Sequence, residues 1–184
     1  MAAQPVIEVR DVWKSFGDNH VLKSINLEVQ DGQTMVVLGP SGCGKSVLLK
    51  HVIGLLRPDR GSIVVEGEDI TKMTNQELNS MRMSFGMVFQ GAALFDSMTI
   101  GENVGLPLKE HRGIEGDELR GLVESKLRMV GLAGISDRRP AELSGGMKKR
   151  VALARAIALD PDIILYDEPT TGLDPIMAEQ INEL

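Results

Sequence analysis

A glycine-rich loop is the first feature of this sequence that can do chemistry. It reads GPSGCGKS over residues 39–46, a Gly-x4-Gly-Lys-Ser spacing. Glycines let consecutive backbone N–H groups curl around phosphate oxygens, and a following helix adds the partial positive charge of its N-terminus. Lys45 would reach the β- and γ-phosphates, and Ser46 would offer its hydroxyl to Mg²⁺. The predicted nucleotide site consists of Gly39, Pro40, Ser41, Gly42, Cys43, Gly44, Lys45, Ser46 and Val47.

Two adjacent carboxylates follow an apolar run near the end of the sequence. Residues 163–166 (IILY) predict a buried strand, and Asp167 and Glu168 come directly after it. Ligands of open α/β sheets bind at the carboxyl ends of the strands. Asp167 is therefore predicted to hold Mg²⁺, and Glu168 to polarise the attacking water. A strand end followed by a helix cap is the alternative, because acidic residues are also common there.

A Ser-Gly-Gly turn in the segment LSGGM, residues 143–147, predicts a second anion site. Ser144 is placed to cap the helix that follows, and Gly145 and Gly146 would leave its first N–H groups accessible. This site has no lysine of its own, so we expect it to bind a γ-phosphate that is held elsewhere. On its own, without the other two motifs, this segment would instead indicate an ordinary turn before a basic helix.

Short apolar segments predict an α/β fold around these motifs. Residues 35–38 lead directly into the glycine-rich loop and indicate a buried parallel strand. Residues 85–89 indicate another apolar strand, which ends at Gln90. Further strands are expected over residues 7–9, 25–29 and 62–66, and helices over residues 45–56, most of 99–132, 151–159 and from 175 onward.

The composition excludes several classes of protein. The formal net charge of -6 argues against a general nucleic-acid binder. No apolar run approaches the roughly 18 residues needed to cross a bilayer, and the N-terminus has no signal-peptide pattern. Cys43 is the only cysteine, which excludes an internal disulfide and fits a reducing cytoplasm. Its place in the loop is compatible with a redox-sensing thiol or simply with a small residue.

The order of these motifs resembles the ATP-binding cassette (ABC) ATPases over nearly the whole chain. The segments that carry the resemblance are GPSGCGKS, Gln90 after an apolar strand, LSGGM, IILYDEP and TGLD. It implies an α/β phosphate-loop NTPase with a RecA-like parallel sheet core, an N-terminal antiparallel β subdomain and an inserted α-helical subdomain. We expect one ATP-binding domain over residues 1–184. Its parts would be the β subdomain with the phosphate-loop core (1–90), the helical subdomain with the signature (91–155), and the carboxylate strand with the D-loop (156–184).

The resemblance also implies a homodimer in which two cassettes pair head to tail around ATP. In the family, the nucleotide lies between the phosphate loop of one cassette and the Ser-Gly-Gly signature of the other. By position, Phe16 matches the aromatic residue that stacks on adenine, although Trp13 competes for this role. Gln90 matches the residue that senses Mg²⁺ and couples to the membrane domain, which places it among the catalytic residues and metal ligands. Asp174 matches the D-loop that crosses the dimer.

Position 147 narrows the resemblance. Met147 stands where many cassettes carry glutamine, and together with FQGAALFDSMTIGENVGLPL and YDEPTTGLDPI it is similar to cassettes of the Mla/Mce group. That similarity implies ATP hydrolysis that drives phospholipid or other lipid traffic. Integral-membrane permease subunits and an exported lipid-binding (Mce-domain) protein would be partners, and the chain would lie in the cytoplasm on the inner face of the membrane. A cassette for a polar substrate, or a soluble ABC ATPase acting on DNA or ribosomes, is the alternative.

The sequence ends sooner than the resemblance leads us to expect. Complete cassettes carry a switch histidine beyond the catalytic glutamate, whereas His20, His51 and His111 all precede Glu168. We therefore expect the C-terminal part of the cassette to be missing, together with some strands. Slow ATP hydrolysis, or nucleotide binding without activity, would follow.

Overall fold

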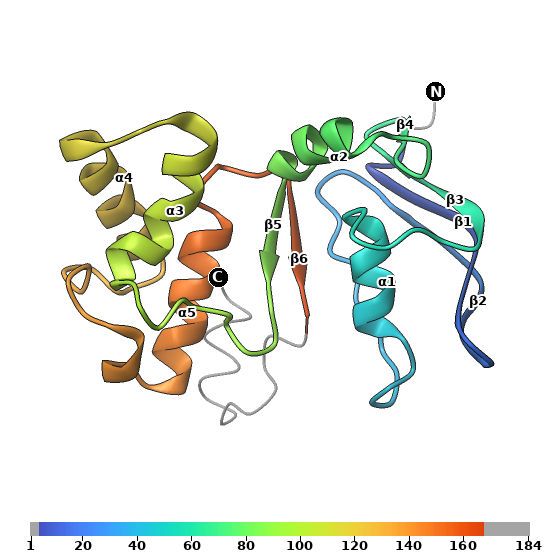
Figure 1. Ribbon diagram of the computed structural model, residues 1–184, viewed down its shortest axis with the longest axis horizontal. Helices are drawn as coiled ribbons and strands as arrows, with labels where there is room; N and C mark the ends of the chain where they lie inside the picture. The colour runs from blue at the N-terminus through green and yellow to red at the C-terminus, as the bar shows by residue number, and fades with distance from the viewer. Residues whose placement is uncertain (1–3, 168–184) are drawn as a thin grey trace. The chain divides into compact units, whose positions relative to one another are not determined.

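The computed structural model describes residues 4–167, which form two compact units divided after Arg82 (Figure 1). Two predicted site residues, Glu168 and Asp174, lie outside the described residues, as does the helix expected from residue 175. A short 3-10 turn, η1 (Arg82–Ser84), spans the division.

The first unit is built on an antiparallel sheet with the strand order β2-β1-β3-β4. The strands are β1 (Ile7–Phe16), β2 (Asn19–Val29), β3 (Arg60–Val65) and β4 (Glu68–Asp69). A two-residue turn joins β1 to β2, and its first residue, Gly17, has a positive φ of 58°, which hairpin turns favour. The predicted antiparallel β subdomain is therefore confirmed. β1 and β2 are longer than the apolar segments that predicted them, because the hairpin pairs polar residues as well.

Two helices complete the first unit, α1 (Lys45–Val52) and α2 (Asn75–Met81). α1 buries Leu48, His51 and Val52. It ends earlier than the predicted residue 56 because Gly54 adopts a left-handed φ of 66°, a conformation that commonly terminates helices. α2 begins with a capping box, in which Thr74 and Glu77 bond reciprocally to each other's backbone N–H groups.

The strand expected over residues 35–38 is absent, so this prediction is wrong. Met35, Val36, Val37 and Leu38 form no strand and are 42%, 68%, 41% and 88% exposed. A parallel strand becomes buried only when neighbouring strands pair with its backbone and helices cover its faces. Within residues 4–82 the sheet ends at β2 and β4, and neither edge accepts residues 35–38. The apolar run therefore leads into the glycine-rich loop without regular secondary structure.

The second unit combines a parallel strand pair with a group of helices. β5 (Phe85–Val88) pairs in parallel with β6 (Ile163–Tyr166), and Val88 lies opposite Tyr166. The remaining elements of this unit are α3 (Ile100–Arg112), α4 (Gly116–Met129), η2 (Pro140–Glu142) and α5 (Gly145–Ala156). The three α-helices lie together beside the strand pair in Figure 1.

One apolar core holds the helices of the second unit together. Its fully buried members include Ile100, Val104, Leu127, Val151 and Ala154. The amphipathic pattern predicted between residues 119 and 130 is confirmed, since its buried residues face this core from α4. α5 starts six residues before the predicted residue 151, because the Ser-Gly-Gly turn opens the helix directly.

Candidate functional site

The phosphate loop runs into α1 as the sequence predicts. Gly44 precedes the helix with a φ of 103°, and it supplies no side-chain cap to the first N–H groups of α1. A Cβ on Gly44 would lie 2.8 Å from Val21 Cγ1, and a Cβ on Gly39 would lie 2.7 Å from Cys43 Sγ. Real Cβ contacts are longer than this, so at Gly44 both the conformation and the space require glycine.

Lys45 is folded over the loop that precedes it. Its Nζ donates to the carbonyl oxygens of Gly39 and Pro40 at 3.0 and 3.1 Å. The Cys43 N–H donates to the same Pro40 carbonyl at 3.3 Å, which closes a turn inside the loop. The ammonium group therefore already lies across the loop whose N–H groups would cradle phosphates, while the Cys43 thiol is exposed.

Phe16 and Trp13, the two candidates for stacking on adenine, have different surroundings. Trp13 is partly buried: its Nε1 donates to Asp11 at 2.7 Å, and the Arg60 guanidinium lies 6.0 Å from its ring centroid. Phe16, at the end of β1, is 49% exposed. Phe16 therefore has the more accessible ring of the two.

β5 and β6 bring two predicted site residues to the same edge of their sheet. Asp167 follows β6 directly, and its N–H donates to the Val88 carbonyl of β5 at 2.9 Å. Gln90 follows β5 by two residues, so both residues lie at the carboxyl ends of parallel strands. Asp167 is buried and Gln90 is exposed. Carboxylate and amide oxygens are ligands of the type that Mg²⁺ prefers.

The Ser-Gly-Gly turn forms the helix start that the sequence predicts. The Ser144 hydroxyl accepts a hydrogen bond from the Met147 N–H at 3.3 Å, and the first turn of α5 contains no acidic residue. Ser144 and Gly145 are exposed, whereas Gly146 is buried. A Cβ on Gly145 would meet nothing within 4 Å. This end of α5 therefore presents backbone N–H groups and a positive dipole to an approaching anion.

Arg155, which the sequence analysis did not single out, contacts the segment after Gln90. It lies in the last turn of α5, and its Nη1 and Nη2 donate to the carbonyls of Ala93 and Ala92 at 2.8 and 3.0 Å. Burial lowers the pKa of Arg155, but a guanidinium group stays protonated in proteins. A signal was present in the sequence: Arg155 interrupts the apolar run VALARAIAL, where a charge must find partners.

Two other side chains hold the continuation of this segment. Asn103 is fully buried in α3; its Oδ1 accepts from the Phe95 N–H at 2.8 Å, and its Nδ2 donates to the Phe95 carbonyl at 3.1 Å. Arg139, just before η2, donates to the Ser97 carbonyl at 3.0 Å. The segment from Ala92 to Ser97 is thus bound to three elements of the second unit.

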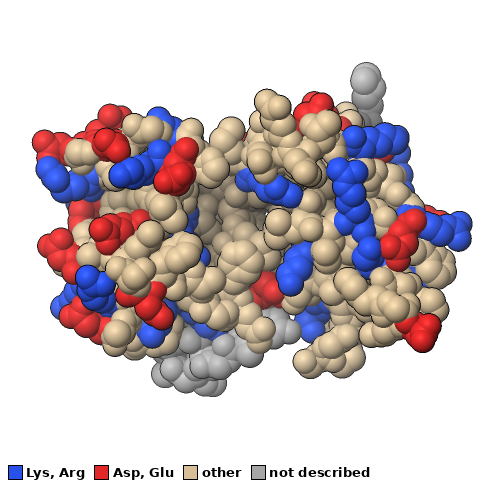
Figure 2. Space-filling model, in the orientation of Figure 1, with Lys and Arg blue, Asp and Glu red and all other residues tan. Residues whose placement is uncertain are grey.

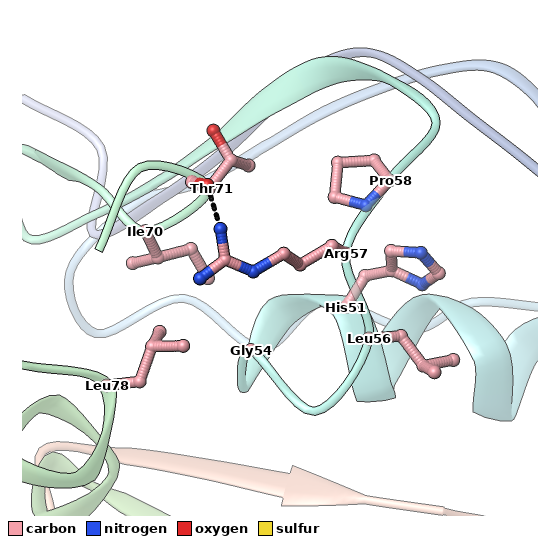
Figure 3. A pocket seen from close by; sticks show the side chains of 8 residues that line it. All are labelled: His51, Gly54, Leu56, Arg57, Pro58, Ile70, Thr71 and Leu78. Carbon is pink, nitrogen blue, oxygen red and sulfur yellow. Dashed lines mark hydrogen bonds between the residues drawn. The ribbon is translucent and has the colours of Figure 1, made fainter. Parts of the chain in front are cut away.

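A small cavity near the end of α1 is a separate feature. Its volume is about 10 Å³, which is room for about one water molecule and far too little for a nucleotide. Figure 3 shows Arg57 reaching across it to the Thr71 carbonyl, a hydrogen bond of 3.1 Å. His51 lies beside it, with Nδ1 2.7 Å from the Val47 carbonyl oxygen. The Arg57 contact joins the segment after α1 to the chain after β4, so the cavity belongs to the packing of the first unit.

The surface drawn in Figure 2 carries both signs of charge, and over α3 and α4 the acidic and basic side chains alternate. On the face drawn, the surface over α3 and α4 therefore differs from the single-signed basic surface that binds nucleic acid. Among the described residues, every helix is too short or too polar to cross a lipid bilayer.

Comparison with known proteins identifies a protein family that matches most of this chain. The family model described as "ABC transporter" matches residues 22–171. The "Probable ribonucleotide transport ATP-binding protein mkl" of Mycobacterium leprae is 48% identical over 97% of this chain and 51% of its own length. The "Intermembrane phospholipid transport system ATP-binding protein MlaF" of Haemophilus influenzae is 46% identical over 94% of this chain and 66% of its own length. The chain therefore spans about half to two thirds of these relatives.

The fold is similar to that of a solved nucleotide-bound dimer. The structure, "Dimeric structure of a post-hydrolysis state of the ATP-binding cassette MJ0796 bound to ADP and Pi", matches with a TM-score of 0.87 and 35% identity. The match covers 96% of this chain and 80% of the other. This likeness confirms the predicted fold class, an α/β phosphate-loop fold with an antiparallel β subdomain and an inserted helical subdomain.

Proposed function

Because the chain belongs to the ABC transporter family, as its motifs predicted, we propose that it is the ATP-hydrolysing subunit of a lipid transporter. The observation that carries the lipid assignment is the similarity to the Haemophilus influenzae relative named for intermembrane phospholipid transport. The loop before α1 and the open start of α5 support the ATP chemistry, since both suit phosphate.

ATP would bind with its phosphates on the loop before α1. The N–H groups of residues 39–47 and the Lys45 ammonium would hold the β- and γ-phosphates, and Phe16 would stack on the adenine ring. Ser46 would offer its hydroxyl to Mg²⁺, and in the second unit Gln90 and Asp167 would offer an amide and a carboxylate oxygen, all of them oxygen ligands of the kind that Mg²⁺ prefers. When bound, Mg²⁺ would neutralise charge on the β- and γ-phosphate oxygens.

Glu168 would act on the attacking water. A carboxylate directly after the Asp167 strand end is positioned by sequence to accept a hydrogen bond from a water near the γ-phosphate. Lys45 would stabilise the negative charge that develops as the bond to that phosphate breaks. Gln90 would orient the same water and metal from the neighbouring strand end.

A second copy of the chain would complete the site. Ser144, Gly145, Gly146 and Met147 would bind the γ-phosphate held on the partner's loop, with Asp174 crossing between the copies. The exposure of Ser144 and Gly145 at the start of α5 supports this proposal, because the first turn also contains no acidic side chain that would repel an anion. The related MJ0796 cassette is dimeric in its ADP- and phosphate-bound structure.

Permease subunits in the membrane would couple this cycle to transport. We expect the chain to work in the cytoplasm on the inner face of the membrane, with an exported lipid-binding (Mce-domain) protein as a further component. A second candidate is a transporter for a polar solute, favoured by the similarity to the mycobacterial relative named for ribonucleotide transport.

ATP-driven dimerisation tests the ATP chemistry. Glu168→Gln should bind ATP and form a stable dimer, as measured by size-exclusion chromatography with light scattering. Its rate of ATP hydrolysis should fall at least about 100-fold. Glu118→Gln, at an exposed position on α4, is the control and should behave like the unchanged protein. A Glu168→Gln variant that stays monomeric with ATP and hydrolyses it normally contradicts the proposal.

Capture of the complex from its own membrane separates the two candidate cargoes. An affinity-tagged Glu168→Gln protein, purified in detergent with its permease, should carry phospholipid enriched above that of a mock purification, as measured by mass spectrometry. Stimulation of ATP hydrolysis by ribonucleotides other than ATP, measured on the complex with Glu168 unchanged, together with no enrichment of lipid in the Glu168→Gln complex, favours the polar-solute transporter instead.

A further inference from the structure

The turn that carries Gln90 has an unusual backbone. The Ala92 N–H donates to the Phe89 carbonyl at 3.0 Å, so Gln90 and Gly91 are the central residues of a β-turn. Ala92 and Ala93 follow with φ angles of 61° and 49°. Two successive left-handed residues with side chains are energetically unfavourable, and such a conformation persists only where surrounding contacts impose it.

Arg155 supplies these contacts. Its two terminal nitrogens donate to the carbonyls of both left-handed residues, Ala92 and Ala93. Hydrogen bonds from a charged donor are stronger than neutral ones, and the planar guanidinium fixes the separation of the two carbonyls. One side chain therefore holds the backbone directly after the Gln90 turn.

The helix that carries Arg155 is itself fixed against the strand that leads to Gln90. A Cβ on Gly86 of β5 would lie 2.6 Å from the carbonyl oxygen of Ala156, the residue after Arg155. The backbones of β5 and α5 thus approach as closely as glycine permits. The guanidinium therefore reaches the turn from a helix whose backbone lies in close contact with β5.

We infer that Arg155 is a positioning residue for Gln90: it imposes the backbone geometry of the turn that carries Gln90, whose amide would contact the nucleotide-bound metal. This inference rests on the proposed function, because it assigns Gln90 a role in Mg²⁺-dependent ATP hydrolysis. Arg155 itself touches neither the nucleotide nor the metal, and it acts only through the turn.

Hydrogen–deuterium exchange of residues 89–94 tests the geometric part without nucleotide. Arg155→Ala should accelerate exchange of this segment about tenfold or more, the range expected for losing a hydrogen bond to a charged group. Arg155→Lys keeps the buried stem and one cationic donor, so it should give a smaller increase and serves if Arg155→Ala does not fold. Arg112→Ala is the matched control, because Arg112 also donates to a backbone carbonyl of this unit, that of Leu159. Unchanged exchange in both Arg155 variants overturns the inference.

A double-variant comparison tests the link to Gln90. Arg155→Lys should slow Mg²⁺-dependent ATP hydrolysis about tenfold in the unchanged background, and have almost no further effect in a Gln90→Ala background. If the two losses multiply, Arg155 acts independently of Gln90 and the inference is wrong. If Gln90→Ala hydrolyses ATP at the normal rate, the assignment of Gln90 within the proposed function fails instead, and the exchange result still reports on the Arg155 contact.

Discussion

Replacement of Gly44 by alanine measures how strongly the fold constrains the phosphate loop. The φ of 103° at Gly44 is left-handed, and an L-residue there costs about 1–2 kcal/mol. The new Cβ would also lie 2.8 Å from Val21 Cγ1 and 3.2 Å from Leu22 Cδ2, both on β2. Overpacking of this kind typically adds about 1–3 kcal/mol. Gly44→Ala should therefore lower the free energy of unfolding by about 2–5 kcal/mol.

Gly42→Ala separates backbone strain from overlap. Gly42 has a similar φ of 79°, but a Cβ there would meet nothing within 4 Å, so only about 1–2 kcal/mol should be lost. Val21→Ala removes the atom nearest to the new methyl group, so adding it to Gly44→Ala should cost less than the two single losses together. Urea unfolding monitored by circular dichroism gives the free energy of unfolding of the unchanged protein, the three single variants and the double variant. Equal losses at Gly42 and Gly44, or simple additivity with Val21→Ala, would refute the steric argument.

Three further variants test other parts of the structure. Phe16→Ala should weaken binding of a fluorescent ATP analogue about tenfold, because ring stacking on a base contributes about 1–3 kcal/mol, whereas Trp13→Phe should leave it unchanged; the opposite ranking would favour Trp13. Asn103→Leu should lower the unfolding free energy by about 2–4 kcal/mol, since it leaves the Phe95 N–H unpaired, and a loss below 1 kcal/mol in urea would contradict this. The Ser136 hydroxyl and the Gly134 N–H lower the pKa of Glu124 from its usual 4.5, so its stabilising contribution is present above pH 4.5 and is lost as the pH falls through the lower, folded-state pKa. Glu124→Gln should therefore lower the melting temperature at pH 7, and the difference in melting temperature from the unchanged protein should shrink in more acidic buffer. A difference that stays the same at low pH would show that the carboxylate charge does not stabilise the fold.

The features that the sequence predicted correctly depend on near neighbours along the chain. The loop before α1 could be predicted because its glycines recur at the spacing that lets backbone N–H groups surround a phosphate. The Ser144 cap follows from a hydroxyl three residues before the N–H of Met147. The buried face of α4 follows from a helical period that needs no knowledge of its partner. Such features were therefore visible in residues 39–46 and 119–147 alone.

The features that the sequence did not predict depend on distant residues. An apolar run such as residues 35–38 is typical of a buried strand, but only pairing with other strands can make it one. The surroundings of the Trp13 ring depend on residues such as Arg60, which lies 6.0 Å from its centroid on another strand. The Arg155 contact joins residues 63 positions apart in the sequence. The left-handed backbone at Ala92 and Ala93 was also unpredictable, because alanine has no intrinsic preference for that conformation.

α5 connects the predicted anion site to the Gln90 turn. Ser144 caps one end of this 12-residue helix, and Arg155 lies about 17 Å away along its axis, in the last turn. Arg139, which precedes Ser144 by five residues, binds the Ser97 carbonyl beyond the same turn. Both ends of the segment from Ala92 to Ser97 are thus hydrogen-bonded to the polypeptide that carries Ser144. A displacement of this segment must either break these arginine–carbonyl bonds or move α5 and Arg139 with it. Breaking them would leave partly buried charge and carbonyls unpaired, so we expect changes at the Gln90 turn and at the Ser144 end of α5 to be coupled.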